Sequence, residues 1–197
     1  MTLVVVIKRG RPTDGGPVKR SATLWCRISA EVRMGVSIKR LGPGDEAILE
    51  LLLKDDADFD LTGRVAARAP LKPSVAQRYL ANPSVLHWIA LEDSVVTGFL
   101  SCSLLLLRAD PGHELVLSEM GVRKVWRSKG VGRALLTHME IWMRNNDVLE
   151  VWVRADNQGA VDFYRSCAFT SVEPQPLYLT RKVEPGFKKA ASTLISG

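Results

Sequence analysis

The sequence predicts an α+β fold in which a mixed, mostly antiparallel sheet is flanked by helices. Two observations predict it. Three extended apolar runs, at residues 86–91, 95–107 and 115–122, follow one another with only short turns between them, which is typical of an antiparallel meander. Helical patterns lie before and after this meander, so that the elements read β-α-α-β-β-β-α-β-α-β-β along the chain.

The first elements of the predicted domain are a short strand and two helices. Residues 36–40 are predicted to form the strand. Pro43-Gly-Asp-Glu then opens a helix, because its carboxylates favour the positive end. Pro73 precedes a second helix, for which we expect Ser74 to be the N-cap. Asn82-Pro83 ends that helix, because the residue before a proline avoids the helical conformation.

The segment between the meander and the next helix is the most informative in the chain. It reads Arg127-Ser-Lys-Gly-Val-Gly132, and the helical face that follows is apolar at Val131, Leu135, Met139 and Trp142. Glycine lets the backbone come close to a ligand, and the first turn of a helix presents unpaired N–H groups with positive partial charge. The segment therefore predicts a phosphate or pyrophosphate site, although its spacing is neither that of a Walker A loop nor that of a full dinucleotide loop.

The last predicted elements are a strand at residues 148–153, a helix at 157–166 and a hairpin. The hairpin pairs residues 169–172 with 177–179 across Pro174. These elements complete the order given above.

The chain of 197 residues is long enough for one domain of ordinary size. We expect this domain to span residues 34–183, with a flexible tail at 184–197. Residues 1–33 include a stretch rich in turn formers and charge, so we expect a disordered leader or a non-native extension that is dispensable for stability and activity. The alternative is that the apolar run at residues 3–7 adds an extra strand at an edge of the sheet.

The net charge of +6 does not indicate a nucleic-acid partner. Residues 1–33 carry +5 of it and residues 34–197 only +1, so the predicted domain is nearly neutral.

No apolar run approaches the ~20 residues of a membrane span, so no membrane partner is expected. Three cysteines without a CxxC pair favour a reducing compartment, and we expect a cytoplasmic protein. The three histidines show no ligand spacing with Cys, Asp or Glu, so no metal site is predicted.

Two blocks of the sequence resemble the GNAT superfamily of N-acetyltransferases. Arg127-x-x-Gly130-x-Gly132, after a strand that ends at Val122, is similar to the acetyl-CoA signature of that family. The block from Asn157 to Phe169 resembles the family's Asn-x-x-Ala-x-x-x-Tyr-x-x-x-Gly-Phe helix and turn, at the expected distance. Ala168 replaces the usual glycine, which costs about 1 kcal/mol of strain if the position needs a positive φ.

This resemblance implies that acetyl-CoA is the cosubstrate. In the family, the last strand of the meander and the strand that follows the next helix splay apart, and the pantetheine arm lies between them. For Asn157 the structural alternative is an N-cap of the following helix, and the two roles are compatible. The implied cofactor-binding residues are Met120, Gly121, Val122, Arg127, Ser128, Lys129, Gly130, Val131, Gly132, Arg133, Asn157 and Tyr164.

Acetyl transfer to an amine needs a base, because an amine with a pKa of about 8–10 is mostly protonated at neutral pH. Glu119 on the third meander strand is the candidate base, and Glu114, nearer the start of that strand, is its competitor. The resemblance puts the hydroxyl of Tyr164 near the thioester sulfur as the candidate acid, and the backbone N–H of Val122 is the candidate oxyanion donor. The alternatives are a surface carboxylate for Glu119 and core packing for Tyr164.

Four carboxylates, Asp55, Asp56, Asp58 and Asp60, lie in the segment that shapes the acceptor pocket in this superfamily. At the mouth of a pocket they would attract a polycation, whereas the structural alternative is a solvated loop. We therefore predict that these four residues bind the substrate.

Four short matches make the acceptor prediction more specific. They resemble the aminoglycoside 3-N-acetyltransferase branch, which usually has aspartate where Glu119 stands. They are Arg40-Leu-Gly-Pro-Gly-Asp-Glu46, Tyr79-Leu80, Ile89-Ala-Leu91 and Val96-Thr-Gly98. The prediction is an N-acetyltransferase acting on a small amine, best an aminoglycoside, and thus a protein of antibiotic resistance. The alternatives are a protein or peptide N-acetyltransferase and a non-catalytic acyl-CoA-binding module, and the resemblance also allows a homodimer.

Overall fold

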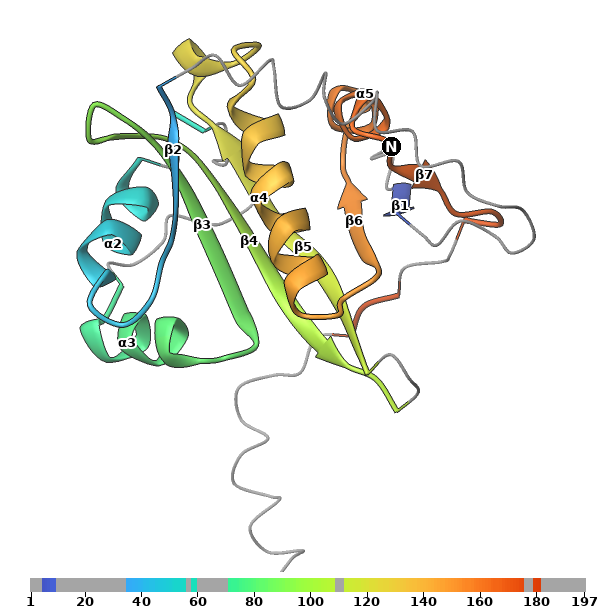
Figure 1. Ribbon diagram of the computed structural model, residues 1–197, viewed down its shortest axis with the longest axis horizontal. Helices are drawn as coiled ribbons and strands as arrows, with labels where there is room; N and C mark the ends of the chain where they lie inside the picture. Colours follow the sequence, from blue (N-terminus) through green and yellow to red (C-terminus); the bar gives the residue numbers. More distant parts are fainter. Residues whose placement is uncertain are drawn as a thin grey trace, which may run out of the picture.

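The structure, a computed structural model, describes residues 5–9, 35–55, 58–59, 71–108, 112–175 and 179–181. In this part of the chain, seven strands form one twisted sheet in the order β2-β3-β4-β5-β6-β1-β7 (Figure 1). The strands are β1 (Val5–Arg9), β2 (Ser37–Arg40), β3 (Val85–Glu92), β4 (Val95–Leu106), β5 (His113–Val122), β6 (Val151–Ala155) and β7 (Thr170–Ser171). The helices are α2 (Glu46–Lys54), α3 (Pro73–Ala81), the 3₁₀ turn η1 (Lys124–Trp126), α4 (Val131–Asn145) and α5 (Gln158–Ser166).

The meander predicted from the sequence is confirmed. Strands β2, β3, β4 and β5 pair antiparallel in chain order, whereas β5 and β6 pair in parallel. The parallel pair follows from the crossover through α4, since a helix between two strands returns the chain in the same direction. The fold is the predicted α+β class with a mixed, mostly antiparallel sheet.

Two apolar cores lie on opposite faces of the meander. Helix α4 crosses one face (Figure 1), where Leu135 and Met139 are completely buried in the larger core. Helices α2 and α3 cover the other face, and their leucines pack against Ile89 and Phe99. Because side chains alternate along a strand, Trp88 and Leu100 point toward α4 while their neighbours Ile89 and Phe99 point toward α2 and α3. Among the described residues, no helix is long and apolar enough to cross a membrane.

The expectation that residues 1–33 lie outside the domain is wrong for Val5–Arg9. This segment, β1, pairs antiparallel with β6 on one side and with β7 on the other. The alternative of an added strand at residues 3–7 is closer to the structure, although β1 lies within the sheet and not at its edge. The free edge of β6 offers backbone N–H and C=O groups that β1 satisfies, and the composition of the segment does not reveal such a partner. Residues 10–34 and 182–197 lie outside the described part.

Two further expectations concern the hairpin near the end of the chain and the start of α3. Thr170–Ser171 form β7, which pairs with β1. Leu179 belongs to no strand, and the other predicted partner residues, 177 and 178, lie outside the described part. Helix α3 begins at Pro73 with Lys72 as its N-cap, so Ser74 is inside the helix. Proline suits the first helical position, since its φ is already helical and its missing N–H would have no partner there.

Candidate active site

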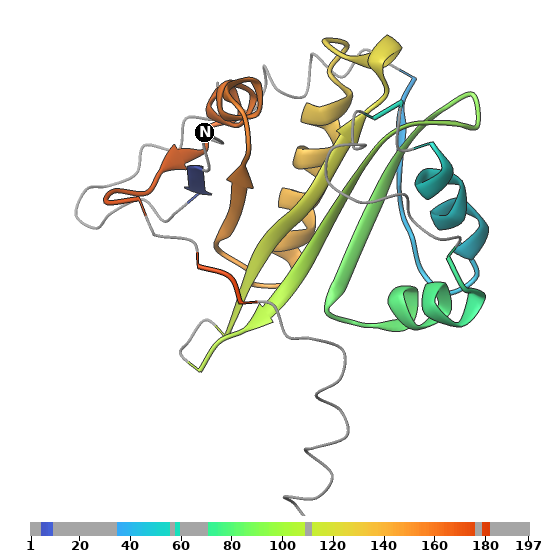
Figure 2. The same cartoon turned by 180° about the vertical axis from the view of Figure 1, so that it is seen from behind.

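Strands β5 and β6 diverge at one end of the sheet, which is the end at which α4 begins. Their pairing covers only Leu115–Leu117 with Val151–Val153. Beyond it, β5 continues to Val122 and β6 continues to Ala155, paired with β1 on its other side. Figure 2 shows the two strands close together at one end and apart at the other. This is the divergence that the resemblance implied, and Met120 and Val122 lie on the diverging part of β5.

The segment Arg127–Gly132, predicted to bind phosphate and called the anion loop below, contains two left-handed residues. Gly130 is the N-cap of α4 with a φ of 84°, in the left-handed region that favours glycine, and Ser128 has a φ of 60°. No side chain caps the helix, and its first turn contains no acidic residue. A Cβ added to Gly130 would meet nothing within 4 Å. The N–H groups of the first turn of α4 thus have no side-chain cap, as a helix start that binds an anion requires.

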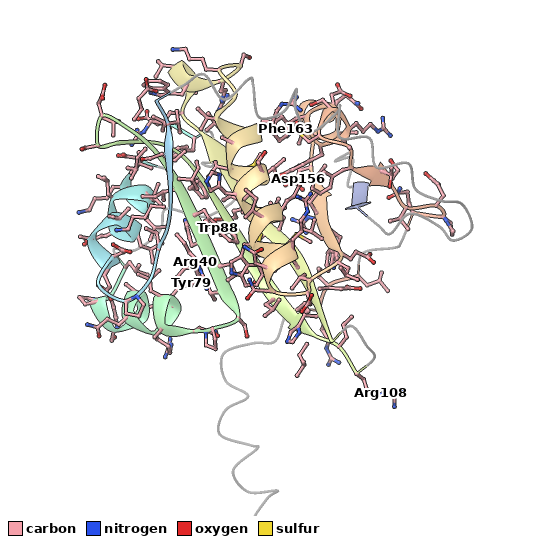
Figure 3. The ribbon with its side chains drawn as sticks, in the orientation of Figure 1. Arg40, Tyr79, Trp88, Arg108, Asp156 and Phe163 are labelled. Carbon is pink, nitrogen blue, oxygen red and sulfur yellow. The ribbon has the colours of Figure 1, made fainter. Side chains whose placement is uncertain are left out.

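Two other glycines of the region are required by packing. A Cβ on Gly132 would lie 3.1 Å from the Phe163 ring, which lies on α5 beside α4 (Figure 3). A Cβ on Gly121 would lie 2.7 Å from the ring of Phe99 and 3.1 Å from that of Phe59. Gly132 thus lets α4 and α5 approach each other, and Gly121 lets two aromatic rings close over β5.

Arg127, Lys129 and Arg133 are cationic residues in or next to the segment Arg127–Gly132. Each of their side chains contacts another part of the protein. Arg127 donates from Nε to the carbonyl of Val122 at 3.1 Å. The ammonium of Lys129 lies 4.7 Å from the centre of the Trp126 ring. Arg133 donates to the carbonyl of Ser166 at 3.2 Å and so joins the start of α4 to the end of α5. These contacts hold positive charge around the open turn.

The second block of the resemblance forms α5 and the turn after it. Asn157 is the N-cap of α5, and its Oδ1 accepts a hydrogen bond from the N–H of Ala160 at 2.9 Å, which confirms the capping role. Tyr164 is 6% exposed and packs between Phe163 and Phe169, with ring centres 5.4 and 5.3 Å away. Ala168 has a φ of 64°, so the position that favours glycine in the family holds a left-handed alanine in this chain.

Glu119 lines a cavity of about 300 Å³ on the face of the sheet covered by α3. Glu119 on β5 pairs with Ser101 on β4, and the register shifts by one residue immediately afterwards. The shift makes Ser118 the extra residue of a β-bulge, a feature that re-aims side chains in a strand. Of the other lining residues, four carry hydroxyl groups, namely Tyr79, Ser101, Ser103 and Ser118, and Val85 and Cys102 complete the lining. The competitor Glu114 pairs with Leu105 near the other end of β5 and does not line the cavity.

Tyr79 lines this cavity and contacts His87, a histidine for which the sequence predicted no role in the site. The hydroxyl of Tyr79 is 3.2 Å from Nδ1 of His87, which is 6% exposed. Burial lowers the pKa of His87 to about 4. The pKa of Tyr79 is raised, first by burial and then by the charge of Glu119, while a hydrogen bond with Ser101 acts in the opposite direction. At neutral pH the imidazole is therefore neutral and the phenol keeps its proton.

Two of the four carboxylates that were predicted to bind the substrate, Asp55 and Asp58, form ion pairs with an arginine. Arg123, which follows β5 and is 15% exposed, forms ion pairs with Asp55 and, at 2.6 Å, with Asp58. Its Nε also donates to the carbonyl of Val96 at 2.6 Å, and its guanidinium lies over the Phe59 ring. Asp55 and Asp58 thus share the single positive charge of Arg123, and neither residue lines the Glu119 cavity. Asp56 and Asp60 lie outside the described residues.

No group of three or more His, Cys, Asp or Glu side chains in the described part of the chain could hold a metal ion. The features that the structure brings together are the uncapped start of α4, a diverging pair of strands beside it and a carboxylate in a cavity lined by residues with hydroxyl groups.

Comparison with known proteins assigns this arrangement to a family. The model of the acetyltransferase (GNAT) family matches residues 48–169, more than half of the chain, so the chain belongs to that family. It is an N-acetyltransferase that uses acetyl-CoA. A comparison with proteins of curated function finds no match.

Solved structures share the fold at low sequence identity. An aminoglycoside acetyltransferase from an uncultured soil metagenomic sample, in complex with sisomicin, is 20% identical with a TM-score of 0.66, over 76% of this chain and 97% of that one. A ribosomal-protein-alanine N-acetyltransferase from Brucella melitensis biovar Abortus 2308 is 17% identical with a TM-score of 0.57, over 75% and 99%. A predicted acetyltransferase from Clostridium acetobutylicum, solved with acetyl-CoA, is 13% identical with a TM-score of 0.59, over 74% and 96%.

Proposed function

We propose that this enzyme acetylates a primary amine of a small, hydroxylated, polycationic acceptor, best an aminoglycoside, bound in the Glu119 cavity. The observation that carries the proposal is the position of Glu119. It is a carboxylate in a hydroxyl-lined cavity, three residues, or about 10 Å, along β5 from Val122 at the diverging end of the strand. A base is thus available between an acceptor cavity and the proposed cofactor site.

The residues around the start of α4 fit the pyrophosphate of acetyl-CoA. The open space over Gly130 and the uncapped first turn of α4 supply N–H donors, and Arg127, Lys129 and Arg133 supply positive charge. The diverging edge of β5, at residues 120–122, is proposed to bind the pantetheine amides, with Asn157 at the start of α5 as a further contact. Bound acetyl-CoA supplies the electrophilic thioester carbonyl.

Glu119 is proposed to take a proton from the acceptor ammonium, directly or through a water molecule, because only the neutral amine is nucleophilic. The N–C bond then forms as the C–S bond breaks, and the N–H of Val122 is proposed to bind the developing oxyanion. Tyr164 is proposed to donate a proton to the departing thiolate. Its packing between Phe163 and Phe169 supports this role by holding the phenol in one orientation.

The acceptor class is supported by the chemistry of the cavity and by the solved relatives named as aminoglycoside acetyltransferases. Hydroxyl groups both donate and accept hydrogen bonds, so they suit a polyhydroxylated ring, and one carboxylate suits one ammonium. Because Asp55 and Asp58 bond to Arg123, we assign them to holding their segment and not to binding the acceptor. A substrate role for Asp56 and Asp60 remains a prediction.

The test is acetyl-CoA turnover, followed by thiol release and by the mass of the product, with sisomicin and with a peptide that has an N-terminal alanine. We expect acetylation of sisomicin and a loss of about 10²-fold or more in kcat for Glu119→Gln. Glu114→Gln is the matched control, on the same strand but away from the cavity, and should keep the wild-type rate. Turnover of the peptide alone would assign the enzyme to protein acetylation. Binding of acetyl-CoA without turnover of any amine would favour a non-catalytic module.

A further inference from the structure

Arg123 directly follows β5, and every nitrogen of its guanidinium group donates a hydrogen bond. Nε donates to the carbonyl of Val96 at 2.6 Å, and the two terminal nitrogens donate to Asp55 and, at 2.6 Å, to Asp58. The backbone N–H of Arg123 also donates to the carbonyl of Thr97 at 2.9 Å. One residue therefore joins the end of β5 both to β4 and to the carboxylates that follow α2.

Phe59 extends this arrangement over the last residues of β5. Its ring is buried, and the ring centre lies 5.0 Å from the guanidinium carbon of Arg123. The ring meets that of Phe99 edge to face, with 5.2 Å between the ring centres. It also covers Gly121, where an added Cβ would lie 3.1 Å from the Phe59 ring. Val122 thus lies between a glycine that Phe59 covers and an arginine bonded to the segment of Phe59.

This support matters because β5 has only one neighbouring strand at this end. In the described sheet, β5 pairs with β6 only at Leu115–Leu117, so the ladder at residues 120–122 joins β5 to β4 alone. The backbone groups of residues 120–122 on the open side are those proposed to bind acetyl-CoA. Donors bind a cofactor and a developing oxyanion well only when they are fixed in place, and a small displacement costs affinity and rate.

The ion pairs make this geometry depend on charge. Arg123 is 15% exposed, Asp55 is partly buried and Asp58 is mostly exposed. A neutral side chain at position 123 would leave two neighbouring carboxylates to repel each other, and Asp55 would lose its cation while partly buried. Both effects disfavour the position of this segment against β5, and Phe59 belongs to the segment.

We infer that Arg123, paired with Asp55 and Asp58, is a positioning residue for acetyl transfer, because it fixes the backbone of residues 120–122. It acts through the strand and not on the phosphates, which are assigned to the residues around the start of α4. This inference rests on the proposed function, which places the pantetheine arm and the thioester carbonyl at residues 120–122.

The test separates the arm of the cofactor from its phosphates. Calorimetry measures the dissociation constants of acetyl-CoA and of phosphoadenosine diphosphate, which is coenzyme A without its pantetheine arm. Arg123→Gln should weaken acetyl-CoA binding by about tenfold, the value of about one hydrogen bond, and leave the constant for the nucleotide unchanged. The KM for sisomicin should also stay unchanged, because Arg123, Asp55 and Asp58 do not line the Glu119 cavity.

Further variants test whether the charge pairing is the cause. Arg123→Lys keeps the charge but has one donor nitrogen in place of a fork, so its loss should be smaller than that of Arg123→Gln. Combining Arg123→Gln with Asp55→Asn and Asp58→Asn removes the repulsion and should restore part of the affinity for acetyl-CoA. Arg144→Gln is the matched control, because it breaks an exposed ion pair with Glu140 on α4, and it should keep the wild-type constants.

Two results overturn the inference. One is an equal loss of acetyl-CoA and nucleotide binding in Arg123→Gln, which would reflect lost phosphate binding or lost folding. The other is unchanged binding of both ligands. Both are compatible with acetylation of sisomicin by the wild-type enzyme. A wild-type enzyme that binds acetyl-CoA no more tightly than the nucleotide would instead count against the proposed position of the pantetheine arm, and thus against the proposed function itself.

Discussion

Acidification should destabilise this protein through one buried imidazole. His87 is 6% exposed, and burial lowers its pKa from 6.5 to about 4. The folded state therefore keeps His87 neutral in a range where the unfolded chain protonates it. As the pH falls below about 6.5, the unfolded state binds the extra proton and is favoured. The stabilisation is fully present above this pH and is lost progressively until the pH reaches about 4.

The size of the effect follows from the shift in pKa. A difference of about 2.5 units at about 1.36 kcal/mol per unit gives a loss of about 3 kcal/mol in the free energy of unfolding between pH 7 and pH 4. The measurement is urea unfolding followed by tryptophan fluorescence at a series of pH values. His87→Gln should remove this part of the slope, because glutamine does not titrate.

The control is His138→Gln, which replaces an exposed histidine on α4 and should keep the wild-type slope. Carboxylates also contribute to acid unfolding, so the informative quantity is the difference between each variant and the wild type. A slope for His87→Gln equal to that of the wild type would show that His87 protonates as readily in the folded protein as in the unfolded chain.

Two substitutions test backbone features of the site. Ala168→Gly should raise the free energy of unfolding by about 1 kcal/mol, because alanine is strained at a φ of 64°, and a decrease in the melting temperature would contradict this. Gly121→Ala should lower it by about 1–3 kcal/mol, because the new Cβ would lie 2.7 Å from the Phe99 ring and 3.1 Å from that of Phe59. Gly35→Ala is the control, because its Cβ would meet nothing within 4 Å. Equal free energies of unfolding for Gly121→Ala and Gly35→Ala would refute the packing argument.

Local patterns were sufficient to predict most of the fold and the start of α4. The meander, α4 and α5 each lie within a continuous stretch whose periodicity and end signals are visible in the sequence. The left-handed Gly130 and the Asn157 cap belong to single turns, so a few adjacent residues encode them. The same is true of Ala168, whose positive φ follows from its place after a helix.

Other features could not be predicted because they depend on partners far away in the chain. The pairing of β1 with β6 joins Val5 to Ala155, and no local pattern near either residue indicates it. The ion pairs of Arg123 with Asp55 and Asp58 involve two carboxylates that had been predicted to bind the substrate.

The sequence by itself determined that this chain has a meander sheet and a helix that begins at a glycine-containing turn, since both arise from the geometry of neighbouring residues. Only the tertiary structure decided what surrounds Glu119. Tyr79 comes from α3 and Ser101 from β4, and they line one cavity with Glu119 on β5 only because the sheet and its covering helix bring the three elements together. Hydrogen bonding, burial and the resulting pKa shifts depend on distance in space, and separation along the chain does not determine that distance.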